Sequence, residues 1–230
     1  MADTDLLVVS RGGVEYKITR GELDTYLNEG YTVVDSMLFN GTDAYLSRTP
    51  TVTGNQKTWT WSGWVKRGSL GTYQVVTKGF TDASNYDRII FFTDNTLRVN
   101  SYISGATSIE LVTNALFRDP SSWYHIIVAI DTTQATESNR AKLFVNGEQV
   151  TSLSVATYPA LNADTNYNDT NLHSIGAEAE YSGTQPFDGY QAEVNFVDGQ
   201  ALTTSAFGET GAFGEWLPKK YTGTYGTNGF

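Results

Sequence analysis

Two neighbouring stretches decide the fold of this chain: SWYHIIVAID at residues 122–131 and KLFVNGEQV at residues 142–150. The first stretch is rich in β-branched and aromatic residues, which favour strands. In the second, Asn146-Gly147 separates two short strand-forming runs, and this dipeptide accepts the positive φ angles of a two-residue hairpin turn. The sequence therefore predicts a strand over 122–131, followed by a hairpin that turns at Asn146-Gly147.

The same pattern continues on both sides of these stretches. In residues 59–65, Trp59, Trp61 and Val65 fall on one face of an alternating strand, and Trp64 falls on the other. No helical period of useful length appears after Tyr31. Further strands are predicted at 36–39, 44–47, 74–78, 88–93, 97–103, 109–113, 172–177 and 190–197. Strands at this regular spacing favour an all-β fold, a two-sheet antiparallel sandwich.

The composition excludes several classes of protein. The chain has 230 residues, of which 13% are aromatic and 17% charged, a profile typical of a β-rich globular protein rather than a disordered one. The net charge of −10 lacks the basic footprint of a nucleic-acid binder and opposes attraction to anionic lipid. We therefore expect neither nucleic acid nor membrane as a partner.

The chain contains no cysteine, which excludes disulfides and thiolate metal sites. Its acidic start, MADTD, and the short apolar run at 6–9 do not resemble a signal peptide. The later apolar run at 126–130 is far shorter than a membrane span. These features predict a protein that is assembled inside a cell and released by lysis.

Three regions are expected along the chain. Residues 1–34 form a small N-terminal element: a hairpin of 5–11 and 14–20 turning at Gly12-Gly13, then a short helix at 21–26. Such a unit buries too little surface to be stable alone and needs a partner to dock on. Residues 35–205 form the sandwich. Residues 206–230 form a C-terminal extension, a loop or the start of a further element, and we expect the natural polypeptide or a partner chain to continue the structure beyond it.

Four segments carry a family resemblance over roughly residues 36–205: FNGTDAYL at 39–46, WTWSGWVK at 59–66, the stretch 123–150, and FDGYQAEV at 187–194. In this order they resemble the motifs of laminin-G-like (concanavalin A-like) domains. The resemblance implies that the sandwich is a jelly roll. It also implies binding to sugars or proteins more often than catalysis.

A second resemblance involves both ends of the chain. DLLVVSRGGVEYKIT at 5–19, followed by Glu22-Leu23, is similar to the start of virion structural proteins of tailed bacteriophages, notably marine ones. VDGQALT at 197–203 with PKKYTGTYGTNGF at 218–230 is similar to laminin-G-like modules of such phages. This implies that residues 1–34 dock the protein to the virion while the jelly roll faces outward. The partners implied are other virion proteins (tail, portal or capsid) and a host cell-surface glycan, with assembly in the host cytoplasm. Because fibres are usually symmetric, a homo-oligomer is expected.

Catalytic residues are not expected. Jelly-roll β-glucanases resemble one another in an E-x-D-x-x-E strand motif, which this chain lacks. Its nearest pair, Glu178 and Glu180, is predicted to be a solvated pair at the rim. His125 lies within an alternating apolar strand and is predicted to be a sheet-face histidine with its hydrogen bonds satisfied, and the chain's only other histidine is His173.

No cofactor is expected apart from a metal, whose presence the sequence leaves open. Laminin-G-like domains often hold Ca²⁺ at a loop rim, so the resemblance makes calcium the metal to consider. The candidate acids are Asp82, Asp87, Asp94, Asp164 and Asp169. They match no specific ligand spacing, and Asp favours turns for backbone reasons, so solvated turn residues are the favoured interpretation.

Exposed aromatic rings are the candidate sugar-binding groups, because a flat apolar ring stacks on a pyranose. Tyr158, Tyr167 and Tyr181 lie in polar loop contexts, with Asn166 beside them, in or near a long loop expected on the surface at 158–170. The alternative is that these residues pack the loops onto the sandwich. Trp59, Trp61, Trp64 and Trp123 are expected in the core or on a sheet face.

The sequence thus predicts a non-enzymatic structural protein of a phage virion, a tail fibre or tail appendage that binds a host glycan. A capsid decoration protein, a glycan-degrading depolymerase and a secreted cellular adhesin are the alternatives. The sequence does not identify the glycan, the host or the position on the particle.

Overall fold

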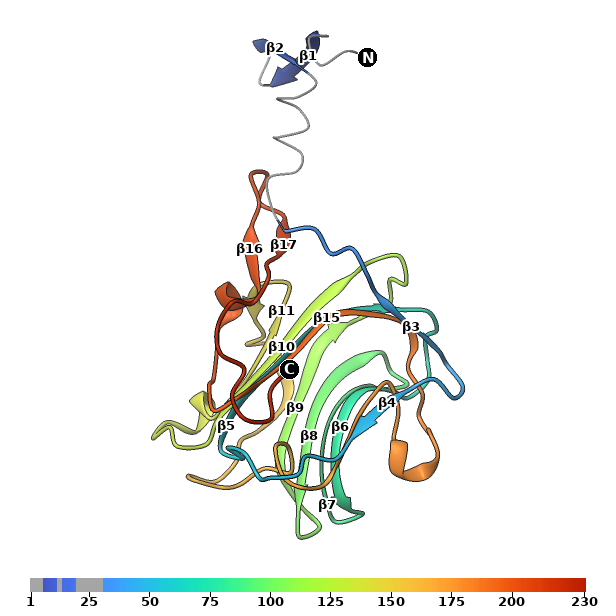
Figure 1. The fold of residues 1–230 in the computed structure, drawn as a ribbon, viewed down its shortest axis with the longest axis vertical. Helices are drawn as coiled ribbons and strands as arrows, with labels where there is room; N and C mark the ends of the chain where they lie inside the picture. The colour runs from blue at the N-terminus through green and yellow to red at the C-terminus, as the bar shows by residue number, and fades with distance from the viewer. Residues whose placement is uncertain (1–5, 12–13, 20–30) are drawn as a thin grey trace.

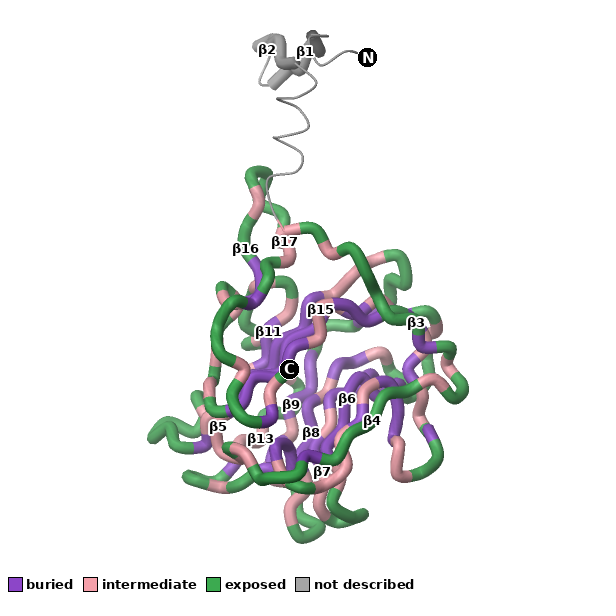
Figure 2. The backbone as a smooth tube through the Cα atoms, viewed as in Figure 1, coloured by how far each residue is buried: buried purple, intermediate pink, exposed green. Residues whose placement is uncertain are grey.

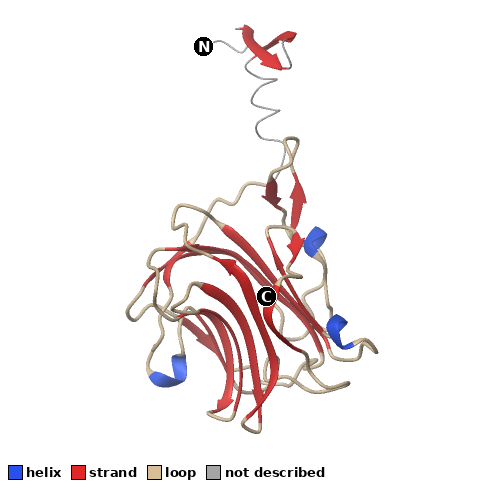
Figure 3. Ribbon diagram, turned by 180° about the vertical axis from the view of Figure 1, so that it is seen from behind, coloured by secondary structure: helices blue, strands red, loops and turns tan. Residues whose placement is uncertain are grey.

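The computed structural model describes residues 6–11, 14–19 and 31–230. Two large antiparallel sheets face each other (Figures 1 and 3), which confirms the all-β sandwich. Within these ranges, the helical elements are three 3₁₀ turns, η1 (Glu137–Asn139), η2 (Ala179–Tyr181) and η3 (Thr204–Ala206). No helix in the described part of the chain has the length and apolar character needed to span a membrane.

One sheet has six strands in the order β12-β11-β10-β5-β15-β3. The other has seven strands in the order β13-β9-β8-β7-β6-β14-β4, and its central strands bend into nested arcs (Figure 1). The bounds in the first sheet are β3 (Met37–Asn40), β5 (Thr58–Arg67), β10 (Tyr124–Asp131), β11 (Ala141–Val145), β12 (Glu148–Gln149) and β15 (Asp188–Asp198). Those in the second are β4 (Leu46–Arg48), β6 (Gln74–Asp82), β7 (Asn85–Phe91), β8 (Thr96–Ile103), β9 (Ala106–Leu116), β13 (Leu153–Thr157) and β14 (Leu172–Ile175).

The stretches 122–131 and 142–150 contain β10 and all but the first residue of the adjacent strand β11. β11 in turn pairs with β12, and between these two strands the chain turns at Asn146 and Gly147 with φ angles of 49° and 87°. Both angles lie in the left-handed region that a type I′ hairpin requires. The turn predicted from this dipeptide is confirmed.

The main core lies between the two sheets (Figure 2). Trp59, Trp61 and Val65 of β5 are almost fully buried in it, whereas Trp64 lies on the opposite face of the sheet, stacked on His125. This is the two-sided arrangement predicted from the alternation. Burial of one large apolar side chain stabilises the fold by about 1.5–3 kcal/mol, so these rings anchor β5 at the centre of its sheet.

The C-terminal extension is more than a loop. It forms a two-stranded hairpin, β16 (Gly208–Thr210) with β17 (Trp216–Pro218), on the outer face of the six-stranded sheet. There a second core forms from sheet residues and extension residues: Ile127, Ala129, Phe144, Val197, Phe207 and Tyr221. The final residue, Phe230, exchanges two backbone hydrogen bonds of 2.9 Å with Phe196 of β15. The extension therefore packs on the sandwich and hydrogen-bonds to it.

In the N-terminal element, β1 (Leu6–Arg11) and β2 (Val14–Thr19) form an antiparallel pair, as the predicted hairpin requires. The turn predicted at Gly12-Gly13 and the helix predicted at 21–26 lie outside the described residues.

The prediction of a surface loop at 158–170 is wrong for its middle part. Residues 165–168 are buried. The carboxylate of Asp87 accepts the backbone N–H groups of Asn166 and Tyr167 at 2.6 and 2.8 Å, which draws the loop inward. Burial raises the pKa of Asp87 even though these bonds favour its charged form.

Candidate functional site

A row of four polar side chains crosses the outer face of the seven-stranded sheet. Lys78 of β6 pairs with Arg88 of β7, Arg88 with Asn100 of β8, and Asn100 with Glu110 of β9. Residues directly opposite each other in antiparallel strands project from the same face. Hydrophobic neighbours of these residues on β7, β8 and β9 point into the main core, so the four side chains point away from it. We call them the polar row.

A row of aromatic rings runs beside the polar row. Phe80 pairs with Tyr86, and Tyr86 with Tyr102. The rings of Tyr86 and Tyr102 stack with centroids 4.9 Å apart and planes inclined by 24°. Tyr181, from η2, contacts Phe80 edge-on at 5.7 Å and is 47% exposed. We call Phe80, Tyr86 and Tyr102 the aromatic row; it leaves partly exposed ring surface on this face.

An ion cluster ties the loop around η2 to the polar row. The ammonium of Lys78 pairs with Glu178 at 2.8 Å and also with Glu180, and Arg88 pairs with Glu178 at 3.2 Å. The side chains of Lys78, Glu178 and Glu180 are 6% exposed or less. The prediction that the two glutamates are solvated is therefore wrong. Their cationic partners lie on strands about a hundred positions earlier in the chain, so only the folded structure brings the charges together.

Three buried polar atoms on this face have no hydrogen-bond partner within the described residues: Oδ1 of Asn100, Nε of Arg88 and Oε2 of Glu180. Asn100 is 2% exposed. A buried polar group without a partner costs about 1–3 kcal/mol, so such groups in a folded protein require an explanation. A bound molecule that donates to Oδ1 of Asn100 and accepts from Nε of Arg88 would satisfy two of these atoms.

The four sugar-binding residues predicted from the sequence do not come together. Tyr181 lies on the outer face beside the aromatic row. Tyr167 is 3% exposed in the main core, where its hydroxyl donates to Oγ1 of Thr77 at 3.2 Å. Asn166 is buried and bonds Asp87, and Tyr158 packs against the edge of the main core. For these three, the structure shows the loop-packing role that was the alternative.

The polar and aromatic rows were not identified from the sequence. Most of their members lie in predicted strands, where alternation is the available signal for a shared face, but Phe80 and Tyr86 lie beyond the predicted ends of 74–78 and 88–93. Alternation within one strand does not show which residues lie opposite each other on neighbouring strands. That depends on the strand order and register, which the folded structure supplies.

His125 has the role predicted for it. Its ring lies between Trp64, stacked at 4.7 Å, and Trp216 of β17, at 6.1 Å. The indole N–H of Trp216 donates to Nδ1 at 2.9 Å, which leaves Nε2 as the protonated nitrogen, 2.9 Å from Oγ of Ser62. Burial lowers the pKa of His125 to about 3. The ring is thus a neutral, satisfied element of the sheet face.

The candidate metal ligands serve separate structural roles. Asp82 and Asp94 accept backbone N–H groups in turns, and Asp87 organises the loop described above. Asp164 pairs with a lysine, and Asp169 accepts a threonine hydroxyl. Among the residues that the structure describes, no group of three or more His, Cys, Asp or Glu is placed to hold a metal ion.

Comparisons with known proteins agree with this architecture. Residues 40–206 match a family model described as the concanavalin A-like lectin/glucanases superfamily. A search of curated proteins found no match. Domain 4 of AbnA, a GH43 extracellular arabinanase from Geobacillus stearothermophilus, solved with arabinotriose, is 21% identical; the match covers 77% of this chain and 80% of that chain, with a TM-score of 0.54.

Two further solved structures are similar. The LG1-3 region of the laminin alpha2 chain is 12% identical over 81% of this chain and 35% of that chain, with a TM-score of 0.53. The native heptameric SAP-like pentraxin from Limulus polyphemus is 15% identical over 74% of this chain and 77% of that chain, with a TM-score of 0.50. At these identities the similarity shows a shared fold.

Proposed function

Because this chain belongs to the concanavalin A-like lectin/glucanases superfamily, we propose that it is a non-catalytic carbohydrate-binding protein whose glycan site is the outer face of the seven-stranded sheet. The observation that carries the proposal is the polar row with its unpartnered atoms, placed beside the aromatic row.

The two rows match the two kinds of surface on a sugar. A pyranose or furanose ring has hydroxyl groups, which donate and accept hydrogen bonds, and C–H faces, which pack on aromatic rings. Asn100 offers an acceptor and Arg88 a donor, and the stacked rings of Tyr86 and Tyr102 lie one row away. Sites with a few fixed polar groups among apolar rings are typical of small-molecule recognition. The arabinotriose bound to the domain of similar fold supports this proposal by analogy.

The ion cluster argues for binding rather than hydrolysis. Glycoside hydrolysis requires two carboxyl groups in different roles, one acting as an acid and one as a nucleophile or base. Glu178 and Glu180 instead pair with the same buried ammonium of Lys78, and Glu178 also pairs with Arg88, which supports a structural role for both carboxylates. A glycan-degrading depolymerase is the second candidate function. Release of reducing sugar from a host polysaccharide by the protein would support it.

The test is titration with arabinotriose, followed by an array of bacterial surface glycans. We expect Asn100→Ala and Tyr86→Ala to weaken binding by about tenfold each, since each removes a contact worth about 1–1.5 kcal/mol. The matched control is Tyr190→Ala, which removes a 40% exposed tyrosine from the six-stranded sheet and leaves binding unchanged. Binding that is unaffected by both outer-face variants would place the glycan elsewhere.

We further propose that the protein is part of a tailed-phage virion, as a tail fibre or tail appendage that forms a homo-oligomer. The support is the resemblance of both chain ends to segments of tailed-phage proteins, together with the antiparallel pair β1–β2 that precedes the sandwich in the chain. A cryo-EM map of the particle tests this. Density at the tail supports an appendage, density over the capsid lattice supports decoration, and absence from the particle favours a free adhesin.

A further inference from the structure

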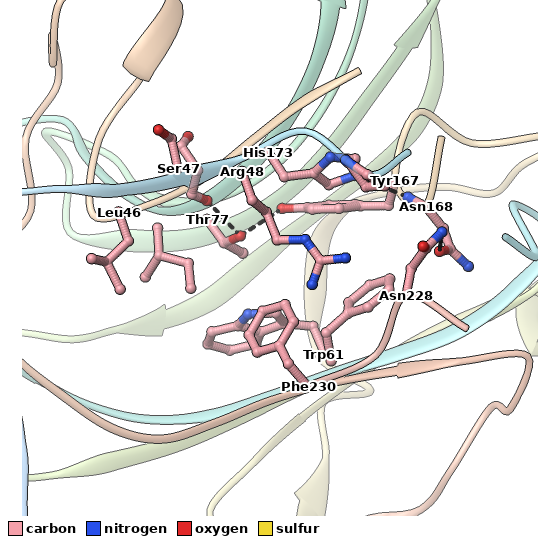
Figure 4. Close-up of a pocket in the computed structure, with 14 residues that line it drawn as sticks. Leu46, Ser47, Arg48, Trp61, Thr77, Tyr167, Asn168, His173, Asn228 and Phe230 are labelled. Carbon is pink, nitrogen blue, oxygen red and sulfur yellow. Dashed lines mark hydrogen bonds between the residues drawn. The ribbon is translucent and has the colours of Figure 1, made fainter. Parts of the chain in front are cut away.

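A cavity of about 320 Å³ lies between the two sheets, on the side where β4 and the C-terminal residues form its walls (Figure 4). This volume is at the lower end of the range of about 300–1,000 Å³ for small-molecule sites. It is separate from the outer face that holds the polar row. Its walls come from both sheets and from the last residues of the chain.

The register of the strands explains why the walls are mostly apolar. On one side, Leu46 of β4 pairs with Ile175 of β14. On the other, Trp61 of β5 pairs with Phe196 of β15, and the ring of Phe230 stacks on Phe196 with centroids 6.2 Å apart. The chain's final side chain thus extends an aromatic wall that begins in the main core.

Most of the polar groups that line the cavity are already bonded. The N–H of Asn168 donates to Nε2 of His173 at 3.0 Å, and Nδ1–H of His173 donates to the carbonyl of Asn171 at 2.9 Å. The hydroxyl of Tyr167 donates to Thr77. Asn228 donates to Oδ1 of Asn168 at 2.9 Å.

Two lining side chains keep donors without a hydrogen-bond partner among the described residues. Trp61 is 1% exposed, its Nε1–H has no acceptor, and Figure 4 shows the indole nitrogen on the ring edge that faces the opposite sheet. Arg48 pairs with His173 across β4 and β14 and lies over the ring of Phe230 at 5.4 Å. Its guanidinium has no carboxylate partner within the described residues.

From this geometry we propose that the cavity binds a small organic anion with an apolar body, such as an alkyl or aryl carboxylate. The body packs against Phe196 and Phe230, and the anionic head accepts hydrogen bonds from Arg48 and the indole N–H of Trp61. A buried donor without a partner is costly, and an anionic acceptor removes that cost while neutralising the unpaired guanidinium. A sugar fits less well, because its hydroxyl groups would lose water against apolar walls that offer few partners.

The test uses octanoate and the full-length protein, with octanol as the uncharged probe of equal chain length. The chain has five tryptophans, so the indole N–H region of an NMR spectrum is simple, and Trp61→Phe identifies the Trp61 peak. We expect octanoate to shift this peak and to leave that of Trp123 unchanged. Absence of octanoate binding, or binding without a shift of the Trp61 peak, would overturn the proposal.

Two variants at exposed positions of β4 test the site without disturbing the core. Arg48→Ala should weaken octanoate binding about threefold to tenfold and leave octanol binding unchanged, because only the charged head contacts Arg48. Leu46→Trp should prevent binding of both octanoate and octanol, because the larger side chain would fill the exposed entrance of the cavity beside β4. Arg98→Ala, which removes an arginine on the outer face, is the matched control and leaves both unchanged. If Arg48 serves only to protect the edge strand, Arg48→Ala does not change octanoate affinity and the proposal fails.

Discussion

The two histidines illustrate how burial controls the chemistry of a residue. His125 and His173 are both neutral, because burial opposes the charged form of each ring, and for His173 the charge of Asp169 does not offset this effect. Burial lowers the pKa of His125 to about 3 and that of His173 to about 4. Neither is poised to exchange a proton near neutral pH, which agrees with a binding protein.

These shifts predict acid destabilisation that begins well above the carboxylate range. In the unfolded chain both histidines titrate near 6.5, so below that pH the unfolded state binds more protons and the free energy of unfolding falls. The slope is about 1.4 kcal/mol per pH unit for each histidine. Urea unfolding between pH 7 and 4.5 measures it, and His173→Gln should halve the slope. A free energy of unfolding that stays constant over this range would contradict the prediction.

Lys78 is predicted to be the key charge of the outer face. Lys78→Ala leaves the carboxylates of Glu178 and Glu180 buried beside each other with one fewer cation, which should cost about 3–5 kcal/mol. Lys57→Ala removes a lysine from an exposed ion pair and should cost less than about 1 kcal/mol. Chemical denaturation of both variants checks the contrast; equal effects would mean that the cluster does not stabilise the fold.

Among the elements, the C-terminal extension contributes to the packing of the sandwich in a way that was not predicted from the sequence. Its hairpin β16–β17 is fixed by Trp216, whose indole donates to His125, and its other aromatic residues cover the apolar outer face of the six-stranded sheet. Without this cover, Ile127, Phe144 and Val197 would be exposed to water on a sheet that already carries one core on its other face.

This arrangement predicts a large effect for Phe207→Ala. The ring is 2% exposed in the second core, so its removal should lower the free energy of unfolding by about 3 kcal/mol. Phe213→Ala, in the same extension but with a ring 70% exposed, should change it by less than about 0.5 kcal/mol. Denaturation curves of the two variants measure the difference. Similar small effects would show that the extension contributes little to stability.

At the scale of the whole molecule, both cores consist of residues from Phe39 onward within the part of the chain that the structure describes. Deletion of residues 1–34 should therefore leave the sandwich folded, with a loss of about 1 kcal/mol from contacts such as the hydrogen bond of Tyr31 to Glu193. Thermal unfolding and circular dichroism of the shortened chain check this. Under the proposed function, the same deletion abolishes incorporation into the particle. A truncated protein that fails to fold would assign the first residues a structural role.

The sequence by itself determined the fold class, most strands, the Asn146-Gly147 turn and the place of His125 on a sheet face. These features depend on neighbours within a few residues, where alternation and turn geometry operate. Only the tertiary structure decided which residues share a surface. The ion cluster joins β6 and η2, the burial of Tyr167 depends on Asp87, and the extension covers a face that the sequence leaves open. Each contact joins distant segments, and a shift of one residue in strand register would turn the side chains to the other face.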